Sequence, residues 1–355
     1  MADRLINNLI PHSKPTIRKN ELQNTLNCMI TDYIGPGDLV RQFEKSLSSA
    51  LNGFFVKTTS SGLTAFFLIL KLLDIKPGDQ IILPSYAPLK LLNVLSYFQA
   101  EPVVVDKEAG DYAPSFEAVE KKMNPRVKAI LLVPLFGQPI HTEKYSTFKV
   151  PVIEDAAQSF GSEFQGRKSG SRAEFSFLSF YATKLITTGG TGGAVVCQNP
   201  EDYQRLISLS ADEPSETQKT TYPFYMSDLQ ASMGIAQLTS IDELIQSRQK
   251  IADFYDSKMK IAGKETQPLF IDRKFSYYRY IIKSGLDIEE SLQLFKNYGI
   301  DARKPIQTPI HRFLSLEKKE FPETEKAFRE NISVPIYPTL KKSDAELIGK
   351  IITKV

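Results

Sequence analysis

The sequence predicts an α/β protein in two unequal parts, a large domain on a mostly parallel sheet and a smaller C-terminal α+β domain. Two observations indicate this class. Short apolar runs alternate with helix-length segments through the first half of the chain, as in strands joined by crossover helices. Some runs are apolar without alternation, such as AILLV at 129–133, which is typical of strands covered on both faces.

The elements of the large domain follow in order along the chain. A first strand, within 52–56, leads into an apolar helix over 63–73. Strands and helices then alternate, because each short apolar run is followed by a longer amphipathic segment. The expected strands are 80–84, 102–106, 127–136 and 150–155, with helices ending near 97 and 123.

The sheet is expected to be mixed. FSFLSF at 175–180 and AVVCQ at 194–198 both look like strands, and the segment between them ends in the glycine-rich turn TTGGTGG at 187–193 and contains no expected helix. A parallel connection needs a crossover of a dozen or more residues, usually a helix. Neighbouring strands without such a helix predict an antiparallel pair within the large domain.

A long helix is expected to join the two domains. Ser227 and Gln230 have the spacing of a capping box, and the helical pattern continues to about residue 259. We place the domain boundary within this helix, giving domains 1–245 and 246–355. The smaller domain is expected to contain a strand at 277–283, helices at 287–298 and 343–354, and a Ser343/Glu346 capping box.

Composition excludes several classes of protein. The net charge of +3 comes from 44 basic and 41 acidic residues, which gives no case for binding nucleic acid or an anionic membrane. Cys28 and Cys197 form no CxxC pair, which fits a reducing, cytoplasmic compartment. The histidines at 12, 141 and 311 share no ligand spacing, so no metal site is expected. No segment is typical of a secretory signal or a membrane span.

The first candidate site segment is KTTSSGLTAFFLIL at 57–70, where a strand leads through Ser61 and Gly62 into an apolar helix. The free N–H groups and positive dipole of a helix start bind phosphate, and glycine allows close approach of the backbone. The simpler interpretation is N-capping by Ser60 or Ser61. This segment alone leaves both open.

The second segment is VPVIEDAAQSFG at 150–161. Its apolar strand ends at Asp155, and the carboxyl ends of strands are where open α/β sheets bind ligands. Asp155 could hold a cationic ring nitrogen, and Gln158 could donate a hydrogen bond to the same ligand. The alternative is that Asp155 caps the following turn.

The third segment is SFLSFYATKLITTGGTGGAVV at 176–196, in which Lys184 follows an apolar strand that carries Ser179. A lysine in an apolar pocket has a lowered pKa and forms imines with carbonyl groups. Ser179 could contact a phosphate, whereas the alternative for Lys184 is a solvated surface charge. The glycines do not have the GxGxxG spacing of a dinucleotide loop.

Together the three segments indicate one cofactor. Pyridoxal 5'-phosphate (PLP) needs an amine for its Schiff base, an acid at its pyridine nitrogen and a cup for its phosphate. The chain offers Lys184, Asp155 and the 61–63 segment for these roles, each next to the end of an expected strand.

At this point the motifs resemble the DegT/DnrJ/StrS family of nucleotide-sugar aminotransferases. The resemblance extends over nearly the whole chain and implies the aspartate-aminotransferase-like fold, fold type I of the PLP-dependent transferases. The motifs that carry it are GPGDLVRQFEKSLSSALN (35–52), SSGLTAF (60–66), PGDQIILPSYAP (77–88), VPLFGQP (133–139), VIEDAAQSFGSEFQGRKSGS (152–171), SFYATKLITTGG (179–190), YMSDLQASMGIAQL (225–238) and VPIYPTL (334–340).

The resemblance implies a role for each matching residue. Lys184 would hold the cofactor and move the proton between the donor carbon and the cofactor, and Asp155 would pair with the pyridine nitrogen. Gln158 would lie near the ring hydroxyl. The phosphate would be held by Ser179 and by the backbone at 62–63, that is Gly62 and Leu63.

The chain also departs from the family pattern. Leu63 stands where a threonine is common, so Ser61 or Thr64 would have to supply that hydroxyl. Pro88 stands where an aromatic residue stacks on the cofactor, and we expect Tyr86 to replace it.

Two further departures affect the phosphate and substrate regions. The family motif GYNYRM appears here as TYPFYM, which places Pro223 and Tyr225 at the positions of its asparagine and arginine. The turn TTGGTGG is one residue longer than the usual GEGG, and Tyr278 replaces a frequent histidine.

The function that the resemblance implies is transfer of an amino group from L-glutamate to a nucleotide-linked keto sugar, in polysaccharide or modified-sugar biosynthesis. Similar enzymes are homodimers with each active site at the subunit interface. One alternative is a PLP-dependent sugar dehydratase, in which the lysine is usually a histidine, so Lys184 counts against it. The other alternative is a cofactor-binding regulatory protein without enzymatic activity.

Overall fold

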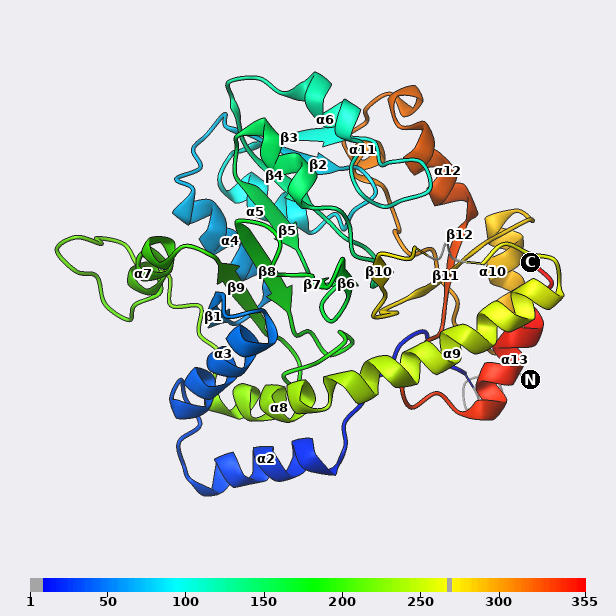
Figure 1. Ribbon diagram of the computed structural model, residues 1–355, viewed down its shortest axis with the longest axis horizontal. Coiled ribbons are helices and arrows are strands. Elements are labelled where there is room, and N and C mark those ends of the chain that lie inside the picture. The colour runs from blue at the N-terminus through cyan, green and yellow to red at the C-terminus, as the bar shows by residue number, and fades with distance from the viewer. Residues whose placement is uncertain (1–8, 267–269) are drawn as a thin grey trace.

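Seven strands form the central sheet of the protein, in the order β1–β9–β8–β5–β4–β2–β3. The computed structural model describes residues 9–266 and 270–355, and Figure 1 shows the sheet with helices on both sides. The strands are β1 (Phe55–Thr59), β2 (Gln80–Pro84), β3 (Glu101–Val105), β4 (Val127–Leu132), β5 (Val152–Asp155), β8 (Phe175–Ser179) and β9 (Gly193–Cys197).

The sheet is mixed in the way the sequence predicts. β3, β2, β4, β5 and β8 pair in parallel, whereas β9 pairs antiparallel with both β8 and β1. The connection between β8 and β9, residues 180–192, contains no crossover helix, and β9 returns beside β8 in the opposite direction. The α/β class with a mostly parallel mixed sheet is therefore confirmed.

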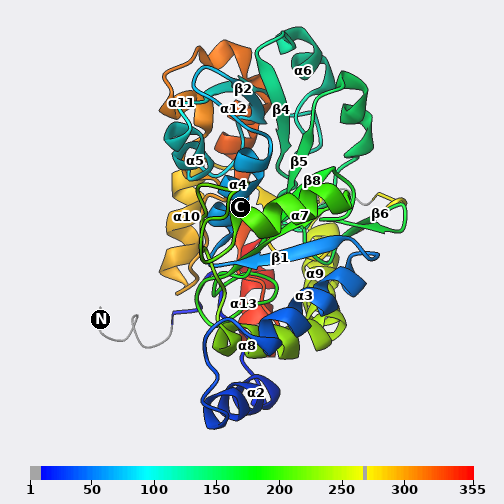
Figure 2. The same ribbon diagram turned by 90° about the vertical axis from the view of Figure 1, so that its left-hand side faces the viewer.

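Two apolar layers cover the faces of the sheet. Successive residues of β8 point to opposite faces: Phe177 stacks on Phe66 of α4 with ring centroids 5.1 Å apart, and Leu178 packs in the layer of α3 and α8. Figure 2 shows α3 and α8 beneath β1. The helices of the sheet region are α2 (Lys19–Ile30), α3 (Asp38–Ala50), α4 (Gly62–Leu72), α5 (Leu91–Tyr97), α6 (Phe116–Lys122), η1 (Glu143–Phe148), α7 (Pro200–Leu209) and α8 (Asp228–Thr239).

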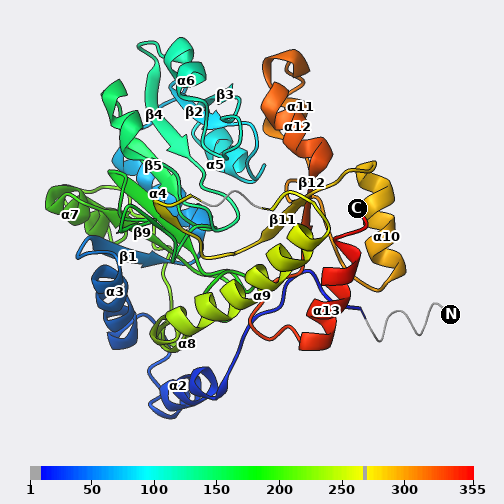
Figure 3. The same cartoon turned by 45° about the vertical axis from the view of Figure 1, so that its right-hand side comes forward.

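The long helix expected after Ser227 is present as two helices. Ser227 accepts a hydrogen bond from the Gln230 backbone, and the Gln230 side chain accepts one from the Ser227 backbone, so the predicted capping box is confirmed. Ser240 separates α8 from α9 (Ile241–Ile261). In Figures 1 and 3, α9 extends from the sheet region to the C-terminal unit.

The C-terminal unit packs around a two-stranded sheet and has its own apolar core, which includes Phe295, Ile332 and Ile348. Helix α13 begins at Lys342 with Lys341 as its N-cap, so the predicted Ser343/Glu346 capping box is wrong: Ser343 lies inside the first turn. The remaining elements are β6 (Glu163–Phe164), β7 (Arg167–Lys168), β10 (Arg273–Lys274), β11 (Tyr280–Lys283), α10 (Ile288–Asn297), α11 (Ile310–Phe313), η2 (Lys318–Glu320), α12 (Pro322–Glu330), β12 (Asn331–Val334) and α13 (Lys342–Ile351).

Each of the two units includes a segment from the other part of the chain. Ile10, from the amino-terminal part, bridges to Ile300 and packs in the core of the C-terminal unit. Conversely, Ile310 and Phe321 pack in the apolar layer of α4 and α5 on the sheet. The C-terminal unit therefore includes residues from before the expected boundary near 245, and part of 246–355 lies on the sheet. Among the described residues, no helix combines the length and apolar character needed to cross a membrane.

Candidate active site

A cavity of about 160 Å³ lies where the carboxyl-terminal ends of β1, β5 and β8 meet. Because β5 and β8 are parallel neighbours, their last residues, Asp155 and Ser179, reach the same edge of the sheet. The residues that line the cavity are Ser61, Gly62, Leu63, Lys90, Leu91, Asp155, Ala157, Phe177, Ser179, Tyr181, Thr191 and Gly192. Five of the eight predicted site residues thus line one cavity.

The N-terminus of α4 opens onto this cavity. Ser61 is its N-cap: the Ser61 hydroxyl accepts from the Thr64 N–H at 3.2 Å, and the Thr64 hydroxyl accepts from the Ser61 N–H at 3.0 Å. Both hydroxyls therefore serve the cap, as the simpler interpretation expected. Among the described residues, the N–H groups of Gly62 and Leu63 have no hydrogen-bond acceptor. Two free donors at a helix N-terminus are suited to a phosphate.

Two glycines allow this helix start to lie against the sheet. A Cβ on Gly62 would lie 2.9 Å from the Ser179 Cβ, and a Cβ on Gly193 would lie 2.3 Å from the Ser61 carbonyl carbon. Real Cβ atoms do not approach other atoms so closely, and the Gly193 contact is to rigid backbone. Glycine at these positions therefore brings the helix start and Ser179 together at the cavity.

Asp155 is buried at the end of β5, with 5% of its surface exposed. Its Oδ1 accepts from the Ala157 N–H at 3.0 Å, so it does cap the following turn. Burial raises the pKa of Asp155, while the charges of Lys184 and Lys90 act in the opposite direction. A cationic partner in the cavity would favour the ionised carboxylate.

Lys184 lies beside the cavity, in the loop between β8 and β9, with its Nζ 4.8 Å from the centre of the Tyr278 ring. Burial lowers the pKa of its amine, and the neighbouring Tyr278 and Asp155 offset part of this effect. A lowered pKa leaves more of the amine uncharged near neutral pH, which is the form that adds to a carbonyl group.

Backbone hydrogen bonds close the loop that carries Lys184. The Phe180 N–H donates to Gly192 O at 2.8 Å, and the Ala182 N–H donates to Gly190 O at 2.9 Å. Within the loop, the Lys184 N–H donates to Tyr181 O at 2.9 Å. The loop therefore holds the lysine in a fixed place relative to the strand ends.

Besides Lys184, two predicted site residues do not line the cavity. Gln158 is half-buried, and its side-chain oxygen accepts from the Phe136 N–H at 3.3 Å. Tyr86 is buried in the core, stacked at 6.0 Å on Tyr112 and edge-on to Phe136. The structure gives Tyr86 no place beside a ring in the cavity, because its side chain points from the loop after β2 into the apolar layer.

Two residues of the site could not be predicted from the sequence. Lys90 lines the cavity, although nothing distinguishes it in the sequence beyond its position two residues after Pro88. Tyr278 was noted only as a departure from a family pattern, yet it is the aromatic ring that faces Lys184. Since Tyr278 belongs to a different unit of the chain, no local motif connects it with the lysine.

The segment with the altered motif, TYPFYM at 221–226, is anchored within its own subunit. The aromatic rings of Tyr222 and Phe224 both contact Phe67 of α4, and Phe224 O accepts from the Ser60 N–H at 2.9 Å. Tyr225 donates its hydroxyl to Asp212 at 2.6 Å. The segment therefore supports the strand-to-helix turn that precedes the cavity.

These residues fit PLP. The free N–H groups at 62–63 suit its phosphate, buried Asp155 suits its pyridine nitrogen, and the Lys184 amine has the lowered pKa that imine formation needs. Leu63, Leu91 and Phe177 supply apolar walls for its ring. No group of metal-ligating side chains occurs in residues 9–266 and 270–355.

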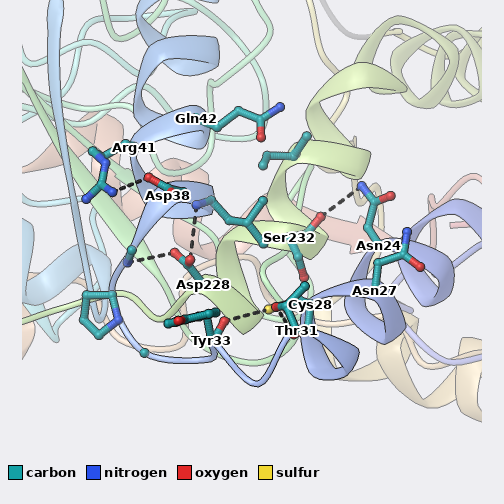
Figure 4. Close-up of a pocket in the computed structure, with 15 residues that line it drawn as sticks. Asn24, Asn27, Cys28, Thr31, Tyr33, Asp38, Arg41, Gln42, Asp228 and Ser232 are labelled. Carbon is teal, nitrogen blue, oxygen red and sulfur yellow. Dashed lines mark hydrogen bonds and ion pairs between the residues drawn. The ribbon is translucent and has the colours of Figure 1, made fainter.

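A larger cavity, of about 760 Å³, lies away from these residues between α2, α3 and α8 (Figure 4). Its buried acid, Asp228, accepts from the N–H groups of Gly37, Leu39 and Val40 at 2.9, 3.2 and 2.8 Å. This carboxylate caps the N-terminus of α3, and its lone pairs are largely used. We therefore assign the chemistry to the smaller cavity.

Comparisons with known proteins agree with this site. The model of the DegT/DnrJ/EryC1/StrS aminotransferase family matches residues 15–353. The chain is 27% identical to the GDP-perosamine synthase of Caulobacter vibrioides, covering 94% of this chain and 95% of that protein. It is 26% identical to the UDP-2-acetamido-2-deoxy-3-oxo-D-glucuronate aminotransferase of Pseudomonas aeruginosa, covering 89% and 90%.

Solved structures show the same fold. The aminotransferase TlmJ from Streptoalloteichus hindustanus superimposes with a TM-score of 0.90 at 25% identity, covering 98% of both chains. Spr1654 from Streptococcus pneumoniae, in its PLP form, gives a TM-score of 0.87 at 26% identity, again covering 98% of both. The chain therefore belongs to the DegT/DnrJ/EryC1/StrS aminotransferase family and is a PLP-dependent aminotransferase.

Proposed function

We propose that the protein transfers the amino group of L-glutamate to a keto sugar linked to a nucleotide, in the biosynthesis of a polysaccharide or a modified sugar. The observation that carries the proposal is the cavity in which the start of α4, Asp155 and Ser179 meet beside Lys184. One site holds a place for phosphate, an acid and an amine, and transamination by PLP requires all three.

Each residue has a distinct role in this proposal. The N–H groups of Gly62 and Leu63, with the Ser179 hydroxyl, would bind the phosphate and fix the position of the cofactor. Asp155 would keep the pyridine nitrogen protonated. When bound, PLP supplies an electron sink for the carbanion that forms at the donor carbon.

Lys184 would act as the base and acid of both half-reactions. Its Nζ would take the proton from the donor carbon of L-glutamate and, in the reverse sense, deliver a proton to the sugar carbon that receives nitrogen. The apolar walls around the cavity exclude water, which strengthens the interaction of Asp155 with developing charge. L-glutamate leaves as 2-oxoglutarate, and the ketone leaves as an amine.

The names of relatives support a sugar substrate. The Pseudomonas protein acts on a UDP-linked 3-oxo sugar by its name, the Caulobacter protein is a synthase of GDP-perosamine, and another relative is a transaminase named for a dTDP-linked amino sugar. Three different nucleotides occur in these names, so the proposal is restricted to the class of nucleotide-linked keto sugars. The retained Lys184 favours transamination over the dehydratase alternative.

We also propose a homodimer with shared active sites, acting in the cytoplasm. Helix α2 supports the dimer, because its apolar side chains Leu22, Leu26, Met29 and Ile30 are exposed and lie at the spacing of one helical face. A contiguous apolar surface of this kind is uncommon on a monomer.

The transfer reaction tests the proposal. Purified protein with PLP and L-glutamate is expected to release 2-oxoglutarate, and GDP-, UDP- and dTDP-linked 4-keto and 3-keto sugars are then screened by mass spectrometry for an amino product. Lys184→Ala is expected to abolish both steps, whereas Lys45→Ala, which changes an exposed lysine on α3, is expected to keep them. Release of 2-oxoglutarate at the wild-type rate by Lys184→Ala would exclude the proposed base.

A further inference from the structure

Tyr278 is a buried tyrosine placed between the catalytic lysine and two arginines. Only 7% of its surface is exposed. The Lys184 Nζ lies 4.8 Å from the centre of its ring, and the Arg279 guanidinium carbon lies 4.9 Å from the same point. Two cations therefore contact one ring, each within the range of a cation–π interaction.

The arginines also contact the polar groups of Tyr278. The Arg279 Nη2 donates to the Tyr278 hydroxyl at 3.5 Å, and the Arg248 Nη1 donates to the Tyr278 carbonyl oxygen at 3.4 Å. Arg248 is itself buried and also donates to Ile336 O at 2.7 Å. Arg248 of helix α9 and Arg279, next to Tyr278 in the segment before β11, thus hold the tyrosine in place.

Positive charge is in excess around this ring. Within the part of the chain that the structure describes, Lys184, Arg248 and Arg279 form no ion pair with a carboxylate. Asp155 and Lys90 face the lysine from the sheet side. Asp155 raises the pKa of the Lys184 amine, and Lys90 lowers it. From the amino-terminal segment His12 contacts Arg279 at 2.6 Å, but burial and the arginines at 279 and 303 lower the pKa of His12 to about 3, so it is neutral.

The cations act on the phenol. Burial alone would raise the pKa of Tyr278, but Lys184, Arg279 and Arg248 lower it to about 7. In return, Tyr278 raises the pKa of the Lys184 amine against the lowering effect of burial. The amine and the phenol therefore each shift the pKa of the other.

We propose that Tyr278 is a positioning residue for Lys184: its ring holds the amine in place beside the cavity, and its phenol tunes the reactivity of that amine. The inference rests on the proposed role of Lys184 as the base of transamination. It assigns to a tyrosine of the C-terminal unit an effect on the reactivity of a lysine in the sheet domain.

The first test uses the cofactor-free protein and does not depend on activity. Tyrosine labelled with ¹³C at Cζ is followed by NMR across pH, and the Tyr278 signal is identified by its absence from Tyr278→Phe. In Lys184→Met the Tyr278 midpoint is expected to rise by about one to two pH units, because an opposite charge at this distance is removed. An unchanged midpoint would overturn the proposal.

The second test follows the amine. Because only the uncharged amine combines with PLP, the rate of cofactor binding rises with pH through the lysine midpoint. Tyr278→Phe is expected to move this midpoint to lower pH by about one unit, since a group that favours the charged amine is lost. The matched control is Tyr277→Phe. This variant changes the adjacent buried tyrosine, which packs on Phe275 in the core of the C-terminal unit.

The outcomes separate this inference from the proposed function. If the wild-type protein binds PLP but Tyr278→Phe and Tyr277→Phe show the wild-type midpoint, Tyr278 is structural only and the inference is wrong. If the wild-type protein binds no PLP, the proposed function fails, while the NMR titration of the cofactor-free protein still decides whether Tyr278 and Lys184 are coupled.

Discussion

At the scale of single residues, position at a strand end decides which side chains meet. Asp155 and Ser179 could be predicted as site residues because each ends an apolar strand, and parallel neighbours end at the same edge. Tyr86 could not be placed from sequence, because the direction of a side chain in the loop after β2 depends on the packing of Tyr112 and Phe136 around it.

Lys90 and Tyr278 were missed for a related reason. Their importance comes from contacts across the fold, which join Lys90 to the cavity of the strand ends and Tyr278 to a lysine in another unit. The spacing of residues in the sequence does not predict such contacts unless the residues belong to a known motif.

Asp155 provides a prediction at this scale. Asp155→Asn keeps the size of the side chain but removes the charge that would face the pyridine nitrogen. We expect the rate of 2-oxoglutarate release to fall by about 10²–10³-fold, the usual effect of losing one preorganised electrostatic group. Stopped-flow measurement with L-glutamate checks this, with Asp242→Asn on the exposed start of α9 as the control. A loss below threefold would rule out the proposed role.

At the scale of elements, the order of strands and helices was predictable, because the periodicity of apolar residues within each segment depends on the local structure of that segment. The antiparallel return of β9 followed from the lack of a helix between it and β8, and the start of α8 followed from the Ser227/Gln230 box. The Ser343/Glu346 box failed because the N-cap of α13 is Lys341, two residues before Ser343.

The close contact of β9 with the start of α4 gives the second prediction. Gly193→Ala would place a Cβ 2.3 Å from the Ser61 carbonyl carbon, so the helix start must move away from the sheet. We expect a loss of about 2–4 kcal/mol in unfolding free energy and weaker PLP binding. Gly190→Ala, where no atom lies within 4 Å of the added Cβ, is the control for denaturation and cofactor titration. Equal stability of the two variants would refute the close contact.

At the scale of the whole molecule, the segment 306–330 connects the C-terminal unit to the sheet. His311 is buried, its Nδ1 lies 2.6 Å from the Ser85 hydroxyl, and its Nε2 lies 2.9 Å from Glu325. Arg312 also pairs with Glu325. This arrangement was not predictable, since its members come from two units and share no local pattern.

The carboxylate of Glu325, which contacts His311 and Arg312, makes the free energy of unfolding depend on pH in the acid range. Hydrogen bonds from Arg312, with a smaller effect of His311, lower the pKa of Glu325 to about 2 against the opposing effect of burial. A folded-state pKa below the unfolded value gives stability that is present above about pH 4.5 and is lost as pH falls towards 2.

We therefore expect Glu325→Gln to lower the unfolding free energy at neutral pH by about 2–3 kcal/mol and to flatten its decline between about pH 5 and 2. Urea denaturation across this pH range measures both effects. Glu317→Gln, at an exposed site near the same helices, is expected to behave as wild type. If the unfolding free energy of Glu325→Gln falls with pH as steeply as that of the wild type, the lowered pKa of Glu325 is contradicted.

The exposed face of α2 provides the prediction on assembly. Leu26→Glu places a charge in the centre of the apolar stripe that also contains Leu22 and Ile30. Burying an unpaired charge in an interface is costly, so the variant is expected to sediment as a monomer, while wild type sediments as a dimer. Asn27→Asp, which adds a charge at an exposed position of α2 outside the stripe, is the control. A wild-type protein that is monomeric at micromolar concentration would contradict the homodimer.

The most direct test of the central claim is to locate the cofactor on the chain. The PLP-loaded protein is reduced with borohydride, which makes the lysine–cofactor link permanent, and its peptides are analysed by mass spectrometry. We predict that the added mass lies on Lys184 and is absent after treatment with L-glutamate before reduction. Attachment to Lys90 or another lysine, or no attachment, would contradict the assignment of Lys184 as the residue that binds PLP.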